Sequence, residues 1–245
     1  MSRDLLPGLP PKAGGGPYHG ARALGRLRVP ARIVTRCAVA DKEALLPAIV
    51  RLGTPVRWIP GESTATFGIS YNGDARTMLV EELGDTWTPA DVPPLRCRWV
   101  HVAPLSRSEW PTATIAALAR RHRVSFDGQG LVRAPELGPL RLDDDFDRDL
   151  LRHVWVLKLA DEEAEVVGDP ARLGVREVLV THGSKGSTVY CGGTREFISA
   201  RAIDRDPTGA GDAFATSYIV GRNAGFSPTG AARRATAVVA SLLAA

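Results

Sequence analysis

The stretch Asp206-Pro207-Thr208-Gly209-Ala210-Gly211-Asp212-Ala213-Phe214-Ala215 places two glycines and an acid where an apolar helix begins. Glycine lets backbone N–H groups turn toward one point, and a helix N-terminus adds partial positive charge there. The pattern predicts an anion cradle formed by Gly209, Ala210 and Gly211. Such a cradle suits phosphoryl transfer to an alcohol, with Asp212 accepting the hydroxyl proton. A Pro-Thr-Gly turn that enters a helix without binding a ligand is the alternative.

Motifs of other enzyme classes find little support. The sequence has no G-x-x-x-x-G-K-[ST], which disfavours a Walker-type kinase. Phe214 stands where a dinucleotide-binding G-x-G-x-x-G would have its third glycine, which disfavours a nicotinamide enzyme. No histidine pair has H-E-x-x-H spacing and no serine lies in G-x-S-x-G, so a zinc site or a serine hydrolase is disfavoured.

Composition limits the partners and the compartment. The 245 residues, 44% of them hydrophobic, fit one α/β domain spanning residues 1–245. Four of the 31 basic residues are Lys and the others are Arg, scattered without a compact basic run, so we expect no nucleic-acid partner. No apolar run approaches the roughly 20 residues that span a bilayer, and we expect no membrane partner. Three unpaired cysteines and the lack of a signal-peptide pattern favour a cytoplasmic protein.

Helical and extended patterns alternate along the chain. This alternation favours a mostly parallel sheet covered by helices on both faces, the layered α/β class. We predict strands over 32–37, 56–59, 99–102, 124–127, 154–157 and 175–181, and helices over 20–27, 41–52, 111–122, 212–222 and 231–243.

The alternation of helical and extended patterns is interrupted at residues 64–83. Two β-rich runs flank Asn72-Gly73, which is a strong hairpin signal. The hairpin is either a lid, at about residues 62–90, or an ordinary part of the sheet. Arg76 faces a substrate only if the hairpin is a lid.

Two segments that contain acidic residues are candidates for a functional role. Asp127 and Gln129 follow a predicted strand, and ligands of open α/β sheets bind outside the carboxyl ends of strands. These two residues either contact the substrate or belong to a simple Asp-Gly turn, and the sequence leaves both interpretations open. The acids at residues 143–149 lack the glycine and terminal Glu of a calcium loop, so a solvated helix start is favoured over a metal cluster.

Several segments together resemble the ribokinase-like (PfkB-type) carbohydrate kinases. Residues 206–214 resemble the C-terminal signature of that family, and residues 14–21 its double-glycine substrate segment. Residues 158–164 resemble its Asn-x-x-Glu segment, and residues 180–186 its Thr-x-Gly-x-x-Gly turn. Residues 126–133 resemble the subgroup that contains inositol kinases. The resemblance implies a three-layer ribokinase-like (Rossmann-like) sheet flanked by helices, with a small β-hairpin lid.

The resemblance also implies roles for individual residues. Asp212 matches the catalytic base, and Ala210, Gly211 and Asp212 match the residues whose N–H groups hold the transferring phosphate. Asp4, Gly15 and Gly16 match substrate positions. Glu163 matches a residue that organises Mg²⁺ through water, and Asp206 and Thr208 match positions that often bind K⁺. The expected residues on the donor side are Lys158, Thr181, Gly183 and Gly186.

The resemblance implies ATP-dependent phosphorylation of a hydroxyl on a small sugar or polyol. An inositol-like polyol is the first substrate to test. The resemblance also implies that two copies of the chain can form a homodimer through the lid. Family chains usually begin with a strand before the position of Asp4 and continue past that of Ala245, and we expect both segments to be missing. This expectation and Ala160, which replaces the family's Asn, favour the alternative of a non-catalytic ligand-binding or regulatory relative.

Overall fold

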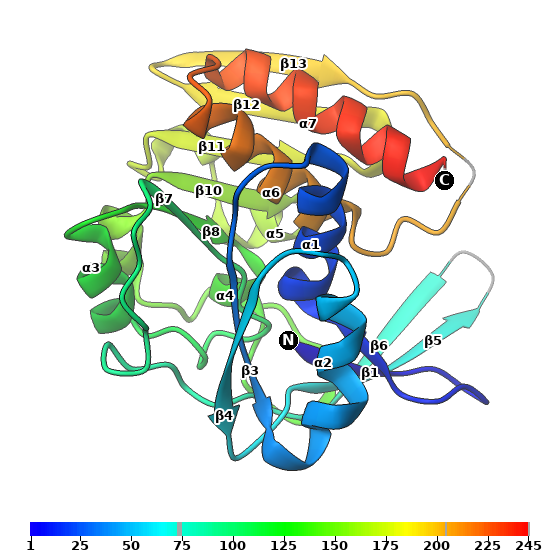
Figure 1. Ribbon diagram of the computed structural model, residues 1–245. Helices are drawn as coiled ribbons and strands as arrows, with labels where there is room; N and C mark the ends of the chain where they lie inside the picture. The colour runs from blue at the N-terminus through cyan, green and yellow to red at the C-terminus, as the bar shows by residue number, and fades with distance from the viewer. Residues whose placement is uncertain (73–74, 204, 245) are drawn as a thin grey trace.

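A six-stranded sheet forms the centre of the molecule (Figure 1). The computed structural model describes residues 1–72, 75–203 and 205–244, and the side chains of residues 71–76 lie outside this description. In sheet order the strands are β13 (Thr194–Ser199), β12 (Gly186–Cys191), β11 (Glu177–Thr181), β10 (Val156–Ala160), β8 (Arg123–Asp127) and β7 (Trp99–Val102). The last four are parallel, so their carboxyl ends meet at one edge.

Helices cover both faces of this sheet, as the alternating pattern predicts. One face carries α3 (Thr112–Ala119), the 3-10 helix η2 (Arg148–His153) and α5 (Asp161–Val167), and the other carries α6 (Ala210–Asn223) and α7 (Pro228–Leu243), with α1 (Gly15–Leu27) beside α6 (Figure 1). Successive strand residues point to opposite faces. Val178 and Val180 accordingly pack in the core on the α3 side, while Leu179 packs against α6 and α7. The predicted layered α/β fold is confirmed.

A separate pair of parallel strands lies beside the main sheet. It consists of β3 (Ile33–Ala38) and β4 (Val56–Gly61), connected through the 3-10 helix η1 (Val39–Asp41) and α2 (Lys42–Val50). The six-stranded sheet ends at β7, and within the described ranges no strand joins β7 to β3. Asp4 itself belongs to a strand of a third sheet.

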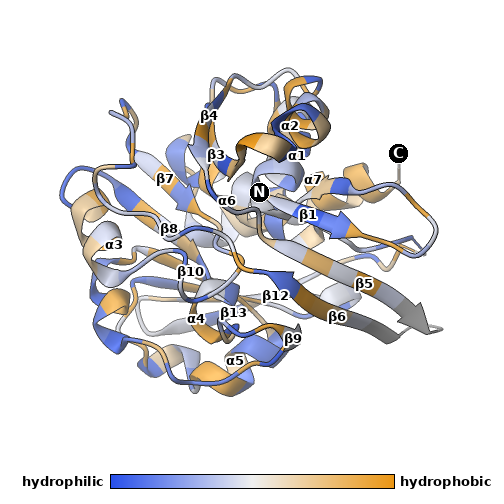
Figure 2. Cartoon of the chain, turned by 90° about the horizontal axis from the view of Figure 1, so that it is seen from below, coloured by the Kyte–Doolittle hydropathy of each residue, from blue (hydrophilic) through white to orange (hydrophobic). Residues whose placement is uncertain are grey.

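The third sheet contains the predicted hairpin. Its order is β2 (Lys12–Gly14), β1 (Ser2–Leu5), β5 (Thr66–Asn72), β6 (Ala75–Glu82) and β9 (Gly138–Pro139). Figure 2 shows β5 and β6 extending together beside β1. The antiparallel pairing of β5 with β6 confirms a hairpin, while residue 73 of the predicted turn and the Arg76 side chain lie outside the described residues.

Some local elements differ from the predicted ones. Helix α1 begins at Gly15, five residues before the predicted start, because Gly15 takes a positive φ of 75° after the extended Gly14. The β12–β13 hairpin was not predicted. It forms where Gly192 and Gly193, both with positive φ, allow a tight reversal between two strands.

The acids of residues 143–149 start η2 rather than forming a metal cluster. Asp147 caps η2 by accepting the N–H of Asp149 at 3.0 Å. Asp143 pairs with Arg107, and with Arg141 at 3.1 Å. Among the described residues, no three His, Cys, Asp or Glu side chains are grouped to hold a metal ion. None of the helices in the described part of the chain is both long and apolar enough to cross a bilayer.

Candidate active site

The glycine turn before α6 presents two free backbone N–H groups. Gly209 is the N-cap of α6 with φ 78°, and a Cβ there would overlap the ring of His19. Within the described residues, the N–H groups of Gly211 and Asp212 have no hydrogen-bond acceptor, as expected for the first turn of a helix. The N–H of Ala210 donates to the Pro207 carbonyl at 2.9 Å. The Ala210 amide therefore closes the turn in this structure, and its predicted part in holding the phosphate stays a prediction.

Asp212 points an unsatisfied carboxylate oxygen into the space beside Gly16. Its Oδ1 is buried and has no hydrogen-bond partner among the described residues. A Cβ on residue 16 would overlap the Ala103 side chain and would lie 3.2 Å from this oxygen, so glycine is required here first by the packing against Ala103. Burial raises the pKa of Asp212, and the charges of Lys158 and Arg133 oppose the rise. A buried carboxylate that is unpaired among the described residues and of raised basicity can accept a proton from a bound hydroxyl.

The ammonium of Lys158 lies close both to Gly211 in the anion cradle and to the carboxylates of Asp127 and Glu163. It lies on β10 on the same face as Val156, which packs toward α6. Its Nζ is 3.5 Å from Asp127 Oδ1 and 3.8 Å from Glu163 Oε2, and a Cβ on residue 211 would lie 3.1 Å from Nζ. Burial lowers the pKa of Lys158, but the surrounding carboxylates outweigh burial and the net direction is upward. A buried, charged ammonium therefore stands directly beside the free amides.

The predicted substrate residues Asp4 and Asp127 both interact electrostatically with Asp212. Asp127 ends β8, and its Oδ1 accepts the N–H of Gln129 at 3.3 Å, so it closes the Asp-Gly turn and also pairs with Lys158. Burial raises the pKa of Asp127 and Lys158 opposes the rise. Asp4, on β1, accepts the hydroxyl of Ser2 at 2.6 Å. A Cβ on Gly14 would overlap the Asp4 carboxylate, so this glycine gives the carboxylate its room.

The residues predicted to bind the phosphate donor and the metal differ in their structural surroundings. Glu163 is buried and its Oε2 accepts the N–H of Ala160 at 2.8 Å, which caps α5 and fixes the carboxylate next to Lys158. Thr181 ends β11 and donates to the Leu159 carbonyl at 3.2 Å. Gly183 has φ 54° with open space around it, whereas a Cβ on Gly186 would overlap the Ile198 carbonyl. The close approach of β13 thus explains glycine at position 186 without a ligand.

Asp206 and Thr208 shape the entry to the cradle. The N–H and the hydroxyl of Thr208 donate to Asp206 Oδ1 at 2.9 and 2.7 Å. This turn holds the backbone that leads into Gly209. The structure therefore assigns both residues a part in the turn, while their predicted part in binding K⁺ stays a prediction.

Two titratable residues near the site, Arg133 and His101, were not singled out from the sequence. Arg133, which follows the short helix α4 (Gln129–Val132), acts electrostatically on Asp127, Lys158 and Asp212. Its place shortly after Asp127 was the available signal. His101, on β7, lies 3.1 Å from the Ser125 hydroxyl through Nδ1. Burial, with a contribution from Lys158, lowers the pKa of His101 to about 4, so its imidazole is neutral near pH 7.

Comparison with known proteins matches a part of the chain to a family. Residues 139–244 match the family described as pfkB family carbohydrate kinase. A solved pyrophosphate-dependent kinase in the ribokinase family, complexed with a pyrophosphate analog and myo-inositol, superposes with a TM-score of 0.87 at 26% identity, over 99% of this chain and 92% of that one. The chain thus carries a PfkB family domain with the ribokinase-like fold, which confirms the resemblance.

Curated relatives share part of their length with this chain. Inositol 3-kinase of Zea mays is 32% identical over 149 residues, covering 59% of this chain and 39% of the relative. Fructokinase of Klebsiella pneumoniae is 32% identical over 181 residues, covering 65% and 58%. The chain therefore matches between about two-fifths and three-fifths of the length of these relatives.

Proposed function

We propose that this protein is a carbohydrate kinase that transfers a phosphoryl group to a hydroxyl of a small polyol or sugar. The observation that carries the proposal is the buried, unpartnered Oδ1 of Asp212 beside the two free amides at the start of α6. A proton acceptor and an anion cradle are the two parts that this transfer requires.

The chain's own residues account for the chemistry as follows. The acceptor hydroxyl, lying near Gly16, loses its proton to Asp212 Oδ1 as its oxygen bonds to phosphorus. The bond from phosphorus to the leaving oxygen of the donor breaks in the same step, and the electron pair stays on that oxygen. The N–H groups of Gly211 and Asp212 and the ammonium of Lys158 stabilise the charge on the transferring oxygens, and they need no rearrangement because they are fixed by the fold.

The substrate side favours a polyol with several hydroxyls. Asp4 and Asp127, which both interact electrostatically with Asp212, offer acceptor oxygens, and the buried Gln129 offers an amide. Carboxylates accept hydrogen bonds from hydroxyl donors, and a ring that carries hydroxyls on several carbons can reach both of them. The matches to inositol 3-kinase and to a kinase complexed with myo-inositol make an inositol-like polyol the first candidate substrate.

We propose ATP as the donor, with pyrophosphate as a specific alternative. The kinase in the ribokinase family that superposes on the whole chain is described as pyrophosphate-dependent. Thr181 and Gly183 would flank the donor. When bound, Mg²⁺ would neutralise charge on the donor phosphates. Glu163 fits it through Oε1 only, because Oε2 is held by the N–H of Ala160 and faces Lys158.

The test is an acceptor and donor panel. Purified protein is incubated with myo-inositol, fructose, ribose and inosine, each with Mg-ATP or with pyrophosphate, and the phosphorylated product is measured by mass spectrometry. Product with any acceptor supports the kinase, and the donor that yields it decides between ATP and pyrophosphate. Stabilisation of the protein by a polyol on heating, with no product from either donor, would instead identify the non-catalytic binder. A lid function of the hairpin, a homodimer through it and a cytoplasmic location stay predictions.

A further inference from the structure

A cavity lies at the end of the central strands opposite to the candidate active site. Its volume is about 490 Å³, and its walls come from the starts of β8 and β10, the loop before β11 and the end of α3. Arg123 opens β8 while Asp127 closes it. At a rise of about 3.3 Å per residue, the two ends of β8 are roughly 13 Å apart. The cavity is therefore separate from the candidate active site.

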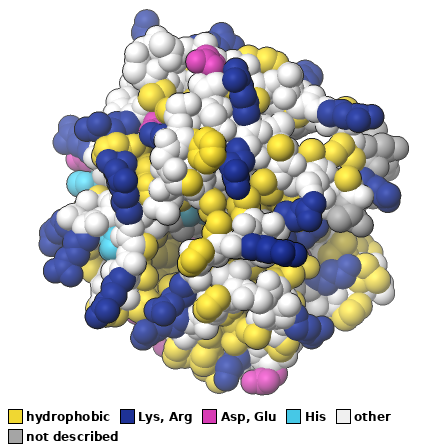
Figure 3. Space-filling view, turned by 45° about the horizontal axis from the view of Figure 1, so that its top comes forward, with side chains coloured by type: hydrophobic (Ala, Val, Ile, Leu, Met, Phe, Trp, Pro, Cys, Tyr) yellow, Lys and Arg dark blue, Asp and Glu magenta, His cyan; other side chains and the backbone are white. Residues whose placement is uncertain are grey.

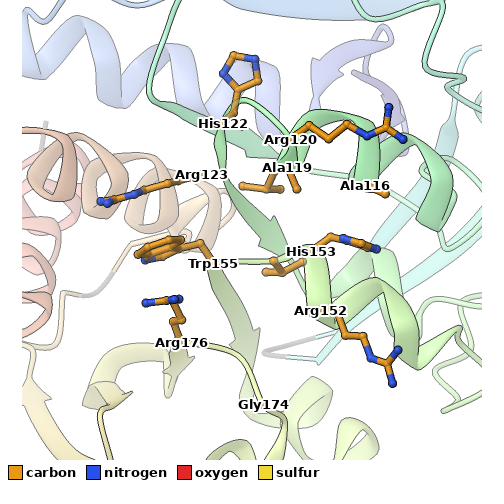
Figure 4. A pocket seen from close by; sticks show the side chains of 12 residues that line it. Ala116, Ala119, Arg120, His122, Arg123, Arg152, His153, Trp155, Gly174 and Arg176 are labelled. Carbon is orange, nitrogen blue, oxygen red and sulfur yellow. The ribbon is translucent and has the colours of Figure 1, made fainter.

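The wall of this cavity is strongly basic. Four guanidinium groups line it, together with two imidazoles and no carboxylate; these are Arg120, Arg123, Arg152, Arg176, His122 and His153. Figure 4 shows Trp155 lying between Arg123 and Arg176. The guanidinium carbons of these two residues are 4.1 and 4.3 Å from the ring centroid of Trp155. The stacking holds both side chains in place, so part of the ordering cost of binding is already met.

The acids closest to the cavity are already engaged. Glu177 is buried and binds Arg222 at 2.7 and 3.0 Å, and it also accepts the hydroxyl of Tyr218 at 2.6 Å. Asp149 pairs with Arg152 at 3.3 Å. In the described part of the chain, no carboxylate forms an ion pair with Arg120, Arg123 or Arg176. Among the described residues, these three arginines of the cavity are thus outside any ion pair with a carboxylate.

The local electrostatics agree with this shortage of anions. The pKa of Arg123 is lowered from its ordinary value, first by burial and then by the guanidinium groups of Arg98, Arg222 and Arg176, while the Glu177 carboxylate opposes part of the lowering. On the face of the molecule in Figure 3, Lys and Arg side chains are prominent and acidic side chains are sparse. An anion bound in the cavity would relieve this repulsion.

We propose that this cavity, the arginine cavity, binds a small anion that carries several phosphate groups. A guanidinium presents paired N–H donors that match phosphate oxygens, and a cluster of them favours clustered phosphates over a single carboxylate. The volume lies within the roughly 300–1,000 Å³ typical of small-molecule sites. A nucleic acid would instead need a basic track along the surface, whereas these four arginines all line one cavity. The proposal does not depend on the kinase function.

Fluorotryptophan NMR locates the binding directly. The chain contains five Trp residues, and the resonance of Trp155 is assigned from the Trp155→Phe variant. Inorganic triphosphate is titrated into the full-length protein, and we expect the Trp155 resonance to shift with a micromolar midpoint that weakens at higher salt. Titrations with ATP and myo-inositol hexakisphosphate identify whether a nucleotide or an inositol phosphate is the better source of the phosphates.

A charge-matched pair of variants separates the arginine cavity from general basicity. The double variant Arg123→Gln/Arg176→Gln removes two charges from the cavity, and Arg51→Gln/Arg233→Gln removes two exposed charges elsewhere. We expect the first to weaken triphosphate binding at least tenfold and the second to change it less than twofold. A Trp155 resonance that stays unmoved at millimolar triphosphate, or equal weakening in both variants, overturns the proposal. A response to duplex DNA alone would also overturn it and would assign the surface to nucleic acid.

Discussion

Lys158 Nζ and Asp127 Oδ1 lie 3.5 Å apart, on adjacent parallel strands that pair these two residues in register. Their side chains are 8% and 2% exposed, so the pair is shielded from water. The same ammonium stands beside Gly211 at the cradle, whereas Asp127 is a predicted substrate residue. Lys158 thus balances the carboxylates of the site and supplies positive charge where the phosphate would lie.

Replacing Lys158 by Met should destabilise the protein at neutral pH. The buried carboxylates of Asp127 and Glu163 would lose their counter-charge, and breaking a buried pair in this way typically costs about 3–5 kcal/mol. The free energy of unfolding, measured by urea denaturation, should fall by that order at pH 7. It should recover as the pH is lowered, because the orphaned carboxyls then take up protons in the folded state.

Lys185→Met is the matched control for this change, since Lys185 is exposed on the turn before β12. It should alter the free energy of unfolding by less than about 0.5 kcal/mol. If the two variants lose equal stability, or if the Lys158 variant shows no pH-dependent recovery, Lys158 does not balance the carboxylates as described.

Asp212→Asn should abolish proton acceptance while the fold is kept. The amide has nearly the same shape, and the carboxylate Oδ1 has no partner to lose among the described residues. General-base assistance is typically worth about 10²–10⁴-fold, so kcat should drop by at least that range in the acceptor assay. Asp144→Asn, at an exposed position, should leave kcat unchanged. Retention of full activity by the Asp212 variant would remove this residue from the role of base.

Gly211→Ala tests the cradle without straining the backbone. Residue 211 is helical, and alanine is favoured over glycine in helices, so stability should stay equal or rise slightly. The added Cβ would lie 3.1 Å from Lys158 Nζ and would occupy the edge of the cradle. We expect KM for the donor to rise and kcat to fall at least tenfold, with the melting temperature kept. Unchanged kinetics would show that phosphate does not approach this amide.

The sequence predicted the layered fold and the position of Asp212, because both depend on local patterns. Residues 175–181 predict a strand, which the structure buries on both faces, and the glycines before Asp212 predict the turn and the helix start. The engagement of the Ala210 amide could not be predicted, since it depends on the fold of the Pro207 turn. The arginine cavity was missed for another reason. Its arginines are scattered in sequence and are brought together only by the parallel register of the strands.

Glu109 should make stability fall as the pH rises. It is 7% exposed, and burial raises its pKa from 4.5 to about 7. A raised folded-state pKa means that the folded protein holds this proton more tightly than the unfolded chain does. Its contribution is therefore fully present below about pH 4.5 and is lost as the pH rises through about 7. At about 1.4 kcal/mol per pKa unit, the loss is on the order of 3 kcal/mol.

Glu109→Gln should remove this slope. The amide oxygen can still accept the N–H of Leu105, which the carboxylate binds at 3.1 Å, and it carries no proton that titrates in this range. Urea denaturation from about pH 5 to about pH 8 should show the wild type losing stability relative to the variant, with the two curves parallel above pH 7. Glu165→Gln, at an exposed position of α5, should keep the wild-type slope. Parallel curves for the wild type and the Glu109 variant over the whole range would mean that this carboxyl is ionised in the fold throughout.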